Sequence, residues 1–155
     1  MKKYQKTIIR EYISCILREQ SSKTGQSAGI IVVKKFNDTW KPLTLIWKNK
    51  FDIPKGGIEP GETTYEAAVR ETYEESQIDN LDFIWGFDFL KVENLTVYVA
   101  ATTQEPKIVE NPETGNKEHD MAMWVDWDIL IARGSPKISI AAQWARIITS
   151  KNNLL

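Results

Sequence analysis

The sequence predicts one α/β domain, an α/β/α sandwich with a mixed sheet, and three observations support this fold class. The chain has 155 residues, enough to close one hydrophobic core without disulfide or metal cross-links. Short runs rich in Ile, Val and aromatic residues predict strands. Segments whose apolar residues recur at helical spacing lie before, between and after them, and no internal repeat is visible. We therefore treat residues 1–155 as a single domain.

In the N-terminal half, the patterns predict a helix followed by a hairpin. Residues 8–19 carry apolar side chains at helical spacing, although their β-branched content would also allow a strand. Residues 28–35 are dense in Ile and Val and predict a core strand. Residues 36–40 contain an Asn-Asp pair and predict a turn, which leads into a return strand at 43–47.

Residues 63–76 form the clearest predicted helix, because they lack Gly and Pro and begin with two threonines that can cap it. The rest of the chain predicts further strands and helices around one polar insertion. These are strands at 83–92 and 95–103, an insertion at 104–120, a strand at 121–127, a helical turn at 128–132 and an amphipathic helix at 136–150.

The composition argues against several classes of function. Twenty basic and 21 acidic residues give a formal charge of −1, which predicts neither general nucleic-acid binding nor membrane binding. Cys15 is the only cysteine, so no intrachain disulfide can form, and its apolar neighbours favour a buried structural thiol. The sequence shows neither the continuous apolar region of a secretion signal nor the run of roughly 18 apolar residues that a membrane-spanning helix needs. We expect a cytoplasmic or host-cytoplasmic protein.

Three glutamates on the 63–76 helix suggest a metal site. Glu71, Glu74 and Glu75 are spaced i, i+3 and i+4, which places them on one helix face, and hard oxygen ligands suit Mg²⁺ or Mn²⁺. An ordinary solvated acidic face is the alternative. We expect that face to look outward into a cleft, while a second face packs on the sheet. The second face consists of Tyr65, Ala68, Val69 and Thr72.

The loop before this helix favours phosphate binding. Residues 52–62 hold two prolines and three glycines, Gly56, Gly57 and Gly61. Glycine permits backbone conformations that other residues resist, and its amide can approach an anion closely. A glycine loop that leads into a helix N-terminus, next to a carboxylate-bound cation, supplies the parts that phosphoryl chemistry needs.

These residues resemble the Nudix box, which the chain carries at 56–78 as GGIEPGETTYEAAVRETYEESQI. Its glycine and its charged positions match at the expected spacing. They are Gly56, Glu62, Arg70, Glu71, Glu74 and Glu75. Thr72 stands where the box has an aliphatic residue, and Gln77 where it has glycine, which puts the turn after the helix in question more than the chemistry.

The resemblance implies a Nudix fold and hydrolysis of a nucleoside diphosphate linked to a second group. Glu71, Glu74 and Glu75 would be the metal ligands, joined by the backbone carbonyl of Lys55. Glu71 or Glu75 is our first choice for the base that activates water, and Glu118 is the alternative.

Two further box residues would act around the ligands. Arg70 would orient the helix through carboxylates, which suits its rigid fork of donors, and Glu62 would support it. Family members often form dimers, so a homodimer is one option.

The segment PKGGIEPGE at 54–62, with the later Glu118, His119 and Trp124, resembles the branch that hydrolyses dinucleoside polyphosphates. Such a small-molecule nucleotide is our first choice of substrate. The alternatives are ADP-ribose, a flavin dinucleotide, a nucleoside triphosphate, an RNA cap, or a non-catalytic module that binds nucleotides. Around the glycine loop, Trp47 and Phe51 are candidates for base stacking.

Other residues near the loop are candidates for phosphate contact. His119 is the only histidine, and either a phosphate contact or an ordinary surface position would suit it. The Lys55 ammonium and the amides of Gly56 and Gly57 complete the predicted substrate site.

Overall fold

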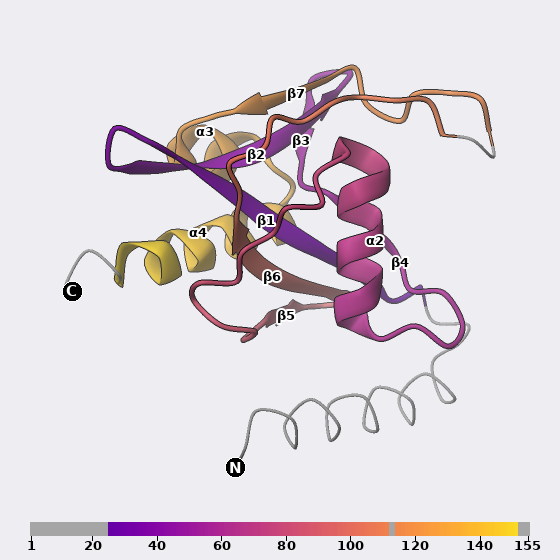
Figure 1. Cartoon of the computed structure of the whole chain (residues 1–155), viewed down its shortest axis with the longest axis horizontal. Helices are drawn as coiled ribbons and strands as arrows, with labels where there is room; N and C mark the ends of the chain where they lie inside the picture. Colours follow the sequence, from indigo (N-terminus) through magenta and orange to yellow (C-terminus); the bar gives the residue numbers. More distant parts are fainter. Residues whose placement is uncertain (1–24, 112–113, 152–155) are drawn as a thin grey trace, which may run out of the picture.

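The computed structural model describes residues 25–111 and 114–151, and the predicted helix at 8–19 lies outside them. The described elements are β1 (Ser27–Phe36), β2 (Thr39–Trp47), β3 (Lys50–Asp52), β4 (Lys55–Gly57), α2 (Thr64–Ser76), β5 (Leu90–Val92), β6 (Leu95–Ala101), β7 (Met121–Trp124), α3 (Trp127–Arg133) and α4 (Pro136–Ser150) (Figure 1).

The strands form a seven-stranded mixed sheet with β1 at its centre. Its main order is β3-β2-β1-β6-β5, and β1 runs parallel to β6 while the other pairs are antiparallel. β1 has different neighbours along its other edge: its first residues pair with β4, and its last residues pair with β2. This change of partner brings β4, and the glycine loop around it, against the start of β1.

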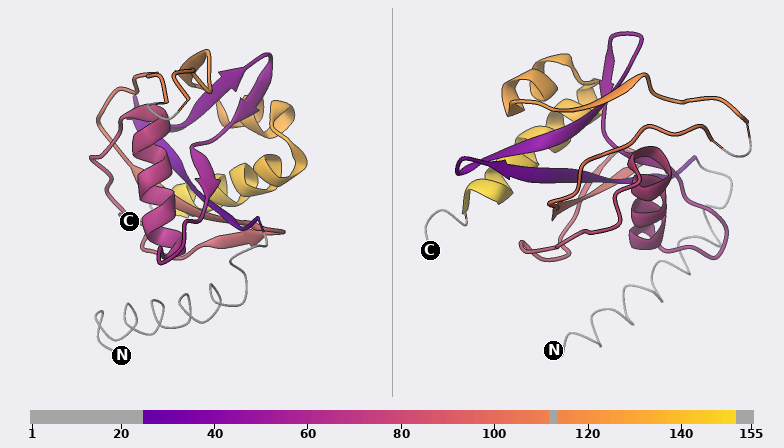
Figure 2. Two further views of the ribbon diagram at one scale, coloured as in Figure 1. Left: turned by 90° about the vertical axis from the view of Figure 1, so that its right-hand side faces the viewer. Right: turned by 45° about the horizontal axis from the view of Figure 1, so that its top comes forward.

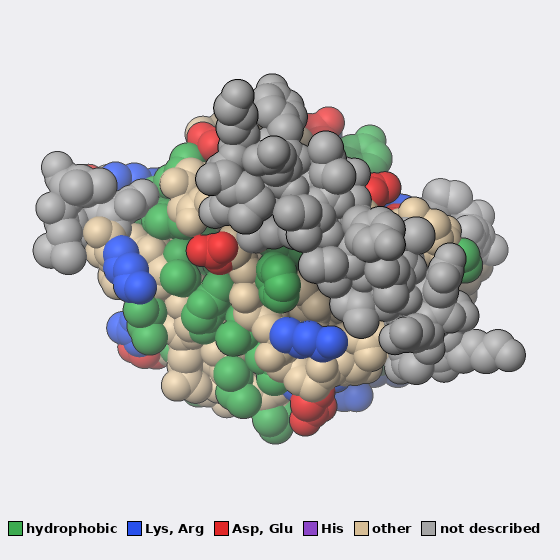
Figure 3. Space-filling view, turned by 90° about the horizontal axis from the view of Figure 1, so that it is seen from below, with side chains coloured by type: hydrophobic (Ala, Val, Ile, Leu, Met, Phe, Trp, Pro, Cys, Tyr) green, Lys and Arg blue, Asp and Glu red, His purple; other side chains and the backbone are tan. Residues whose placement is uncertain are grey.

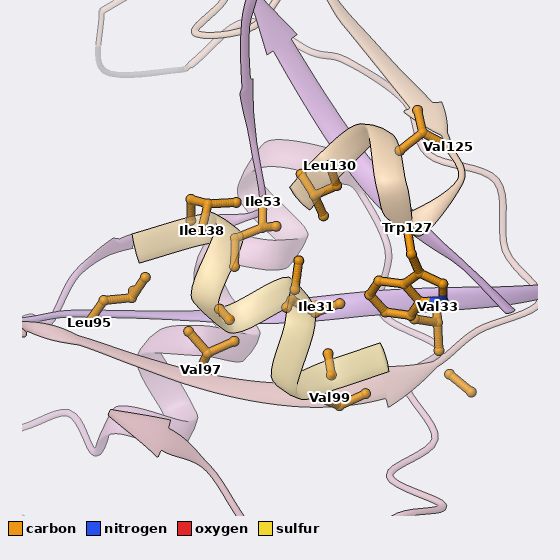
Figure 4. Packing of buried hydrophobic residues seen from close by; sticks show 14 residues of the cluster. Ile31, Val33, Ile53, Leu95, Val97, Val99, Val125, Trp127, Leu130 and Ile138 are labelled. Atoms are coloured by element: carbon orange, nitrogen blue, oxygen red, sulfur yellow. The ribbon is translucent and has the colours of Figure 1, made fainter. Parts of the chain in front are cut away.

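Helices cover both faces of the sheet (Figure 2). α2 packs over the face formed by alternate residues of β1 and β6, including Ala28, Ile30 and Tyr98. α3 and α4 cover the other face, where Ile31 and the neighbouring strands meet Leu130 and Ile138 (Figure 4). The period-2 alternation of β1 therefore supplies both cores. This confirms the predicted α/β/α sandwich with a mixed sheet.

Two hairpins flank β2, and the sequence predicted the first of them. Asn37 and Asp38 both have positive φ, at 45° and 68°, which matches the two-residue turns that the twist of antiparallel strands favours. Lys48 and Asn49 repeat this geometry before β3, at 48° and 63°. This second turn was not predicted from the sequence.

Other boundaries were wrong for local reasons. The strand predicted at 83–92 is reduced to Leu90–Val92, because the chain turns at Gly86, whose φ is 90° and whose N–H donates to Phe83. The strand predicted at 121–127 ends at Trp124, since Trp127 already begins α3. The described residues contain no helix long and apolar enough to span a membrane.

Candidate active site

α2 carries the acidic residues, and its ends are fixed by specific caps. The Thr63 hydroxyl accepts from the Glu66 N–H at 3.0 Å and donates to the Glu66 carboxylate at 3.0 Å, a reciprocal capping arrangement. Gln77 ends the helix in the left-handed conformation, with φ 60° and ψ 17°, and its N–H donates to Tyr73 O at 2.8 Å. Gln77 thus adopts the left-handed backbone conformation at the position where the box has glycine.

The acidic face of α2 is turned toward β4 rather than outward, which corrects the prediction. The Glu71 and Glu75 side chains are only 14% and 6% exposed, whereas Glu74 is 51% exposed. The predicted packing face is also rotated: Tyr65 is exposed and Val69 only half-buried. The helix positions that are fully buried are small or hydroxyl-bearing. They are Ala67, Ala68, Thr72 and Ser76.

Arg70 ties the carboxylates of this region together. Its guanidinium donates to both oxygens of Glu62, at 2.7 and 3.0 Å, to Glu71 at 2.9 Å and to Glu74 at 3.1 Å. It also donates to the carbonyl of Gly57 at 2.9 Å. The planar fork of Arg can satisfy several acceptors at once. Arg70 therefore links the glycine loop to α2. Together with Glu62, it is one of the two residues expected to act around the metal ligands.

Gly56 lies directly beneath the Glu71 carboxylate. A Cβ at this position would collide with the carboxylate carbon and both its oxygens. Gly56 is therefore required for close approach, not for an unusual φ. Burial raises the pKa of Glu71, and the hydrogen bond from Arg70 opposes that rise.

The other two loop glycines have different roles. Gly61 has a φ of 84°, which favours glycine. Gly57 has no positive φ, and a Cβ at this position would meet no described atom within 4 Å. The expectation that all three glycines supply special backbone conformations holds only for Gly61.

Glu75 is the most enclosed carboxylate of α2. One oxygen accepts from the Lys55 backbone N–H at 3.2 Å, and the other lies 3.2 Å from Nδ1 of His119. Burial raises the pKa of Glu75 to about 9, and the charges of Glu71 and Asp52 add to the rise. A nearby cation, or the binding of a proton, would therefore stabilise the Glu75 side chain.

The predicted insertion brings two residues to this site. His119 is largely buried beside Glu75, and burial lowers its pKa, so the imidazole is neutral at pH 7. Glu118 remains exposed, and Asn111 donates to it at 2.8 Å. The charge of Glu118 still raises the pKa of Glu71 and Glu75. The structure thus places His119 in contact with Glu75, and Glu118 close enough for its charge to act on Glu71 and Glu75.

Sequence reasoning missed Asp52. Its carboxylate pairs with the Lys55 ammonium at 2.9 Å, and its charge raises the pKa of both Glu75 and His119. Its position at the start of the loop, three residues before Lys55, was the available signal. Lys55 therefore offers its N–H to Glu75 and its ammonium to Asp52.

The two candidates for base stacking lie in different surroundings. Trp47 is exposed, and the Lys48 ammonium lies 4.4 Å from the centre of its ring. Phe51 packs against the core, and the Arg133 guanidinium lies 4.3 Å from its ring centre. The open ring of Trp47 is the better placed of the two for a base. Trp124 is held by structural contacts, with Phe36 at 6.1 Å and a hydrogen bond to Glu105 at 3.0 Å.

The donor set fits a hard divalent cation, although its atoms are not yet gathered around one point. Within the described part of the chain, no three His, Cys, Asp or Glu side chains form a ready metal-binding group. The reason is visible in the contacts: Arg70 bridges Glu71 and Glu74, and Glu75 faces Lys55 and His119. Two buried carboxylates with raised pKa values, beside an exposed third, provide the oxygen ligands that such ions prefer.

A mixed sheet with a carboxylate-bearing helix on one face defines a fold that solved Nudix hydrolases share. A C. elegans Ap4A hydrolase in a binary complex matches with a TM-score of 0.57 at 19% identity, over 84% of this chain and 97% of that chain. A Nudix hydrolase from M. smegmatis matches with a TM-score of 0.62 at 17% identity, over 84% and 88%. At these identities the likeness concerns the fold.

The family model of the NUDIX domain matches residues 10–145, so the chain belongs to the NUDIX family. This confirms the family predicted from the box at 56–78. Nudix hydrolases generally need divalent metal ions.

Curated relatives match over a shorter stretch. An RNA pyrophosphohydrolase of Rhodopseudomonas palustris (strain HaA2) is 44% identical over 41 residues, which are 26% of this chain and 22% of that protein. The same-named protein of strain ATCC BAA-98 / CGA009 is 41% identical over 39 residues, which are 25% and 21%. The chain thus matches only about a fifth of the length of these relatives.

Proposed function

We propose that the chain is a Mg²⁺-dependent hydrolase that cuts the pyrophosphate linkage of a nucleoside diphosphate derivative, with a dinucleoside polyphosphate as substrate. The observation that carries the proposal is the pair of buried carboxylates, Glu71 and Glu75, held against β4 of the glycine loop. Buried acidic groups with raised pKa values in a family enzyme are typical of a functional site.

Glu71, Glu74 and Glu75 would hold the cation, with the carbonyl of Lys55 as a further oxygen ligand. Mg²⁺ fits carboxylate ligands best, and Mn²⁺ would be accepted by the same set. A cation bound there supplies neutralisation of phosphate charge and a more acidic water. Glu74 is the exposed member, so it can turn from Arg70 toward a ligand position without disturbing the core.

The chain's own residues would position α2, the phosphates of the substrate and the Glu75 carboxylate. Arg70, held by Glu62 and the Gly57 carbonyl, keeps α2 in register with the glycine loop. The Lys55 ammonium and the backbone at Gly56 and Gly57 would face the phosphates. His119 keeps Glu75 in place on the side of the insertion, through its Nδ1.

The choice of base remains among the glutamates. Glu71 or Glu75 is favoured from the family resemblance, and Glu118 is the exposed alternative within reach of their charges. Glu118→Gln decides between them. If Glu118 is the base, kcat should fall about 100-fold with little change in metal affinity. If kcat falls less than about threefold, the base lies among the α2 glutamates.

The substrate assignment rests on the segment at 54–62 and on Glu118, His119 and Trp124, and the likeness to a fold neighbour named as an Ap4A hydrolase supports it. The match to proteins named RNA pyrophosphohydrolase favours a second candidate, the 5′-terminal pyrophosphate of an RNA. Both substrates present the same phosphoanhydride to the site, so the second group decides between them.

The test is product analysis on the purified protein with Mg²⁺. The panel holds diadenosine tetraphosphate, a 5′-triphosphorylated RNA oligonucleotide, ADP-ribose, flavin dinucleotide and a nucleoside triphosphate. Glu74→Gln and Glu75→Gln should abolish turnover of the preferred substrate. Glu66→Gln is the matched control on the same helix, because Gln can replace Glu in its capping role. Turnover that survives in both ligand variants would contradict the proposal, and a binding module would show metal-dependent nucleotide binding without products.

A further inference from the structure

Five aromatic rings form one connected cluster beside the first turn of α2, here called the aromatic patch: Tyr65, Phe83, Phe87, Phe89 and Tyr98. Phe89 lies 5.8 Å from Tyr98, and Tyr98 lies 5.9 Å from Tyr65 between ring centres. Tyr65 continues to Phe83 at 5.4 Å and Phe87 at 5.6 Å. The Tyr98 hydroxyl is fixed by Thr64 at 2.7 Å. The patch is therefore built from α2, β6 and the loop before β5.

Three rings of the patch are partly exposed to solvent. Phe89 is 47% exposed, and Tyr65 and Phe87 are exposed as well, whereas Tyr98 is buried. Figure 3 views the protein from the side on which β5 lies, and hydrophobic side chains are gathered on this face. Contiguous exposed aromatic side chains on a soluble domain mark an interaction surface more often than chance. None of these rings contributes to the carboxylate site.

The chain itself contains a segment with the pattern to cover such a surface. Residues 8–17 carry an apolar residue at nearly every position of one helical face, in the spacing i, i+3, i+4, i+7 and i+8. The apolar residues are Ile8, Ile9, Tyr12, Ile13, Ile16 and Leu17. Arg10 and Glu11 lie on the other face. A helix with one apolar face is stable only when that face is buried against another surface.

The connection is long enough to place this segment on the patch. The described chain begins beside β6, where Ser27 and Val92 both pair with Leu95, so they lie roughly 10 Å apart across two strand spacings. Phe89 comes three residues before Val92, just before the start of β5, roughly another 10 Å away. Residues 18–24 can span about 24 Å when extended. The patch therefore lies within reach.

The sizes of the two surfaces also agree. A ten-residue helix is about 15 Å long. The path from Phe89 through Tyr98 and Tyr65 to Phe87 has ring-to-ring steps of 5.8, 5.9 and 5.6 Å, so its span is comparable. We propose that residues 8–17 dock as an amphipathic helix on the aromatic patch of the same chain. A short tether gives the segment a local concentration of about 1 mM, which favours it over a second copy at micromolar concentration.

Docking there links the N-terminal segment to α2. Tyr65 lies in the first turn of the helix that carries the acidic residues, and Thr64 next to it holds Tyr98. The docked segment would bury the outer rings and hold the first turn of α2 against β6.

The single cysteine of the chain allows a direct test. Cys15 lies at the edge of the apolar face of the segment. Lys91→Cys places a second thiol on β5, on the same side of the strand as Phe89 and at an exposed position. Ile147→Cys is the matched control, since it is exposed on α4, over the opposite face of the sheet.

The experiment treats dilute full-length protein with a short bifunctional maleimide and measures intramolecular cross-links by intact mass and peptide mapping. We expect the Lys91→Cys protein to cross-link to Cys15 about tenfold faster than the Ile147→Cys protein. Ile13→Lys, on the apolar face, should remove this advantage. Glu11→Lys adds the same charge on the polar face and should leave it unchanged.

Three results would overturn the proposal. Equal rates for the two cysteine variants would show that the segment does not dwell on the patch. An unchanged rate with Ile13→Lys would show that its apolar face is not the contact. Cross-linked dimers in place of intramolecular products would assign the patch to a second copy. None of these readouts depends on substrate hydrolysis, so the result is independent of the proposed activity.

Discussion

Arg70→Gln should lower the stability of the metal-free protein, because it removes a cation that the acidic residues of α2 and its loop share. Arg70 is 23% exposed and donates to Glu62, Glu71 and Glu74 as well as to Gly57 O. Without it, largely buried carboxylates face one another with no counter-charge. Removing one partner of a buried ion pair costs about 3 to 5 kcal/mol.

The lower end of this range applies here, because Glu74 is half in solvent and contributes little. We expect a loss of about 3 kcal/mol, which corresponds to a fall in Tm of roughly 6 to 12 °C for a domain of this size. Arg70→Lys should give an intermediate loss, since Lys keeps the charge but cannot bridge several acceptors. At low pH the loss should shrink as the carboxylates become protonated.

The measurement is thermal unfolding in the presence of a chelator, followed by circular dichroism at two pH values. Arg146→Gln is the control: its pair with Asp128 is 2.8 Å long but lies in solvent, with side chains 51% and 82% exposed. That variant should change stability by less than about 1 kcal/mol. If Arg70→Gln were no more destabilising than Arg146→Gln, the idea that Arg70 holds the acidic site together would be refuted.

Three further substitutions test the site and its caps. Glu75→Gln should stabilise the chelated protein, because the raised pKa of Glu75 makes the stability of the unsubstituted protein fall as the pH rises from the unfolded pKa of 4.5 to the folded pKa of about 9. The gain should grow by roughly 1 kcal/mol for each pH unit in this window. Urea unfolding at pH 5 and pH 8 measures this gain, and an equal gain at the two pH values would contradict the prediction. Gly56→Ala should destabilise by about 1 to 3 kcal/mol and impair turnover, because its Cβ meets the Glu71 carboxylate, whereas Gly57→Ala should change stability by less than about 0.5 kcal/mol. Gln77→Gly should raise the free energy of unfolding by about 1 kcal/mol, because glycine adopts the left-handed backbone conformation without strain. If denaturant unfolding shows a lower free energy instead, the hydrogen bond of the Gln77 side chain stabilises the protein by more than the strain costs.

The sequence predicted those parts of the fold that depend on local pattern. The apolar run at 28–35 became β1, and the capping threonine at 63 set the start of α2 one residue later. The limits of the prediction appear where partners distant in sequence decide. β4 exists because Gly56 pairs with Ala28, and no pattern inside the loop indicates a strand. The loop before β5 contains strand-forming residues, yet Gly86 and the ring contacts turn it into a surface patch.

The geometry of the candidate site could be predicted to a similar extent, and for a similar reason. Helical spacing brings Glu71, Glu74 and Glu75 to one side of α2, but it cannot tell which way that side faces. The orientation follows from the buried residues opposite and from Gly56, which leaves room for Glu71. Asp52 was missed because its importance lies in its distance to Lys55, a tertiary property.

The predicted effects of Arg70→Gln and Glu75→Gln have opposite signs for stability, and this difference distinguishes a functional site from a structural ion network. In a network that serves stability, each carboxylate would be matched by a cation, and neutralising it would cost free energy. Glu75 has no basic side chain within ion-pair distance other than neutral His119, among the described residues, and its burial is unfavourable by itself. A fold that keeps such a group retains a destabilising element. We propose that the gain that accounts for its presence comes from what the site binds, namely the cation that the acidic face of α2 is suited to hold.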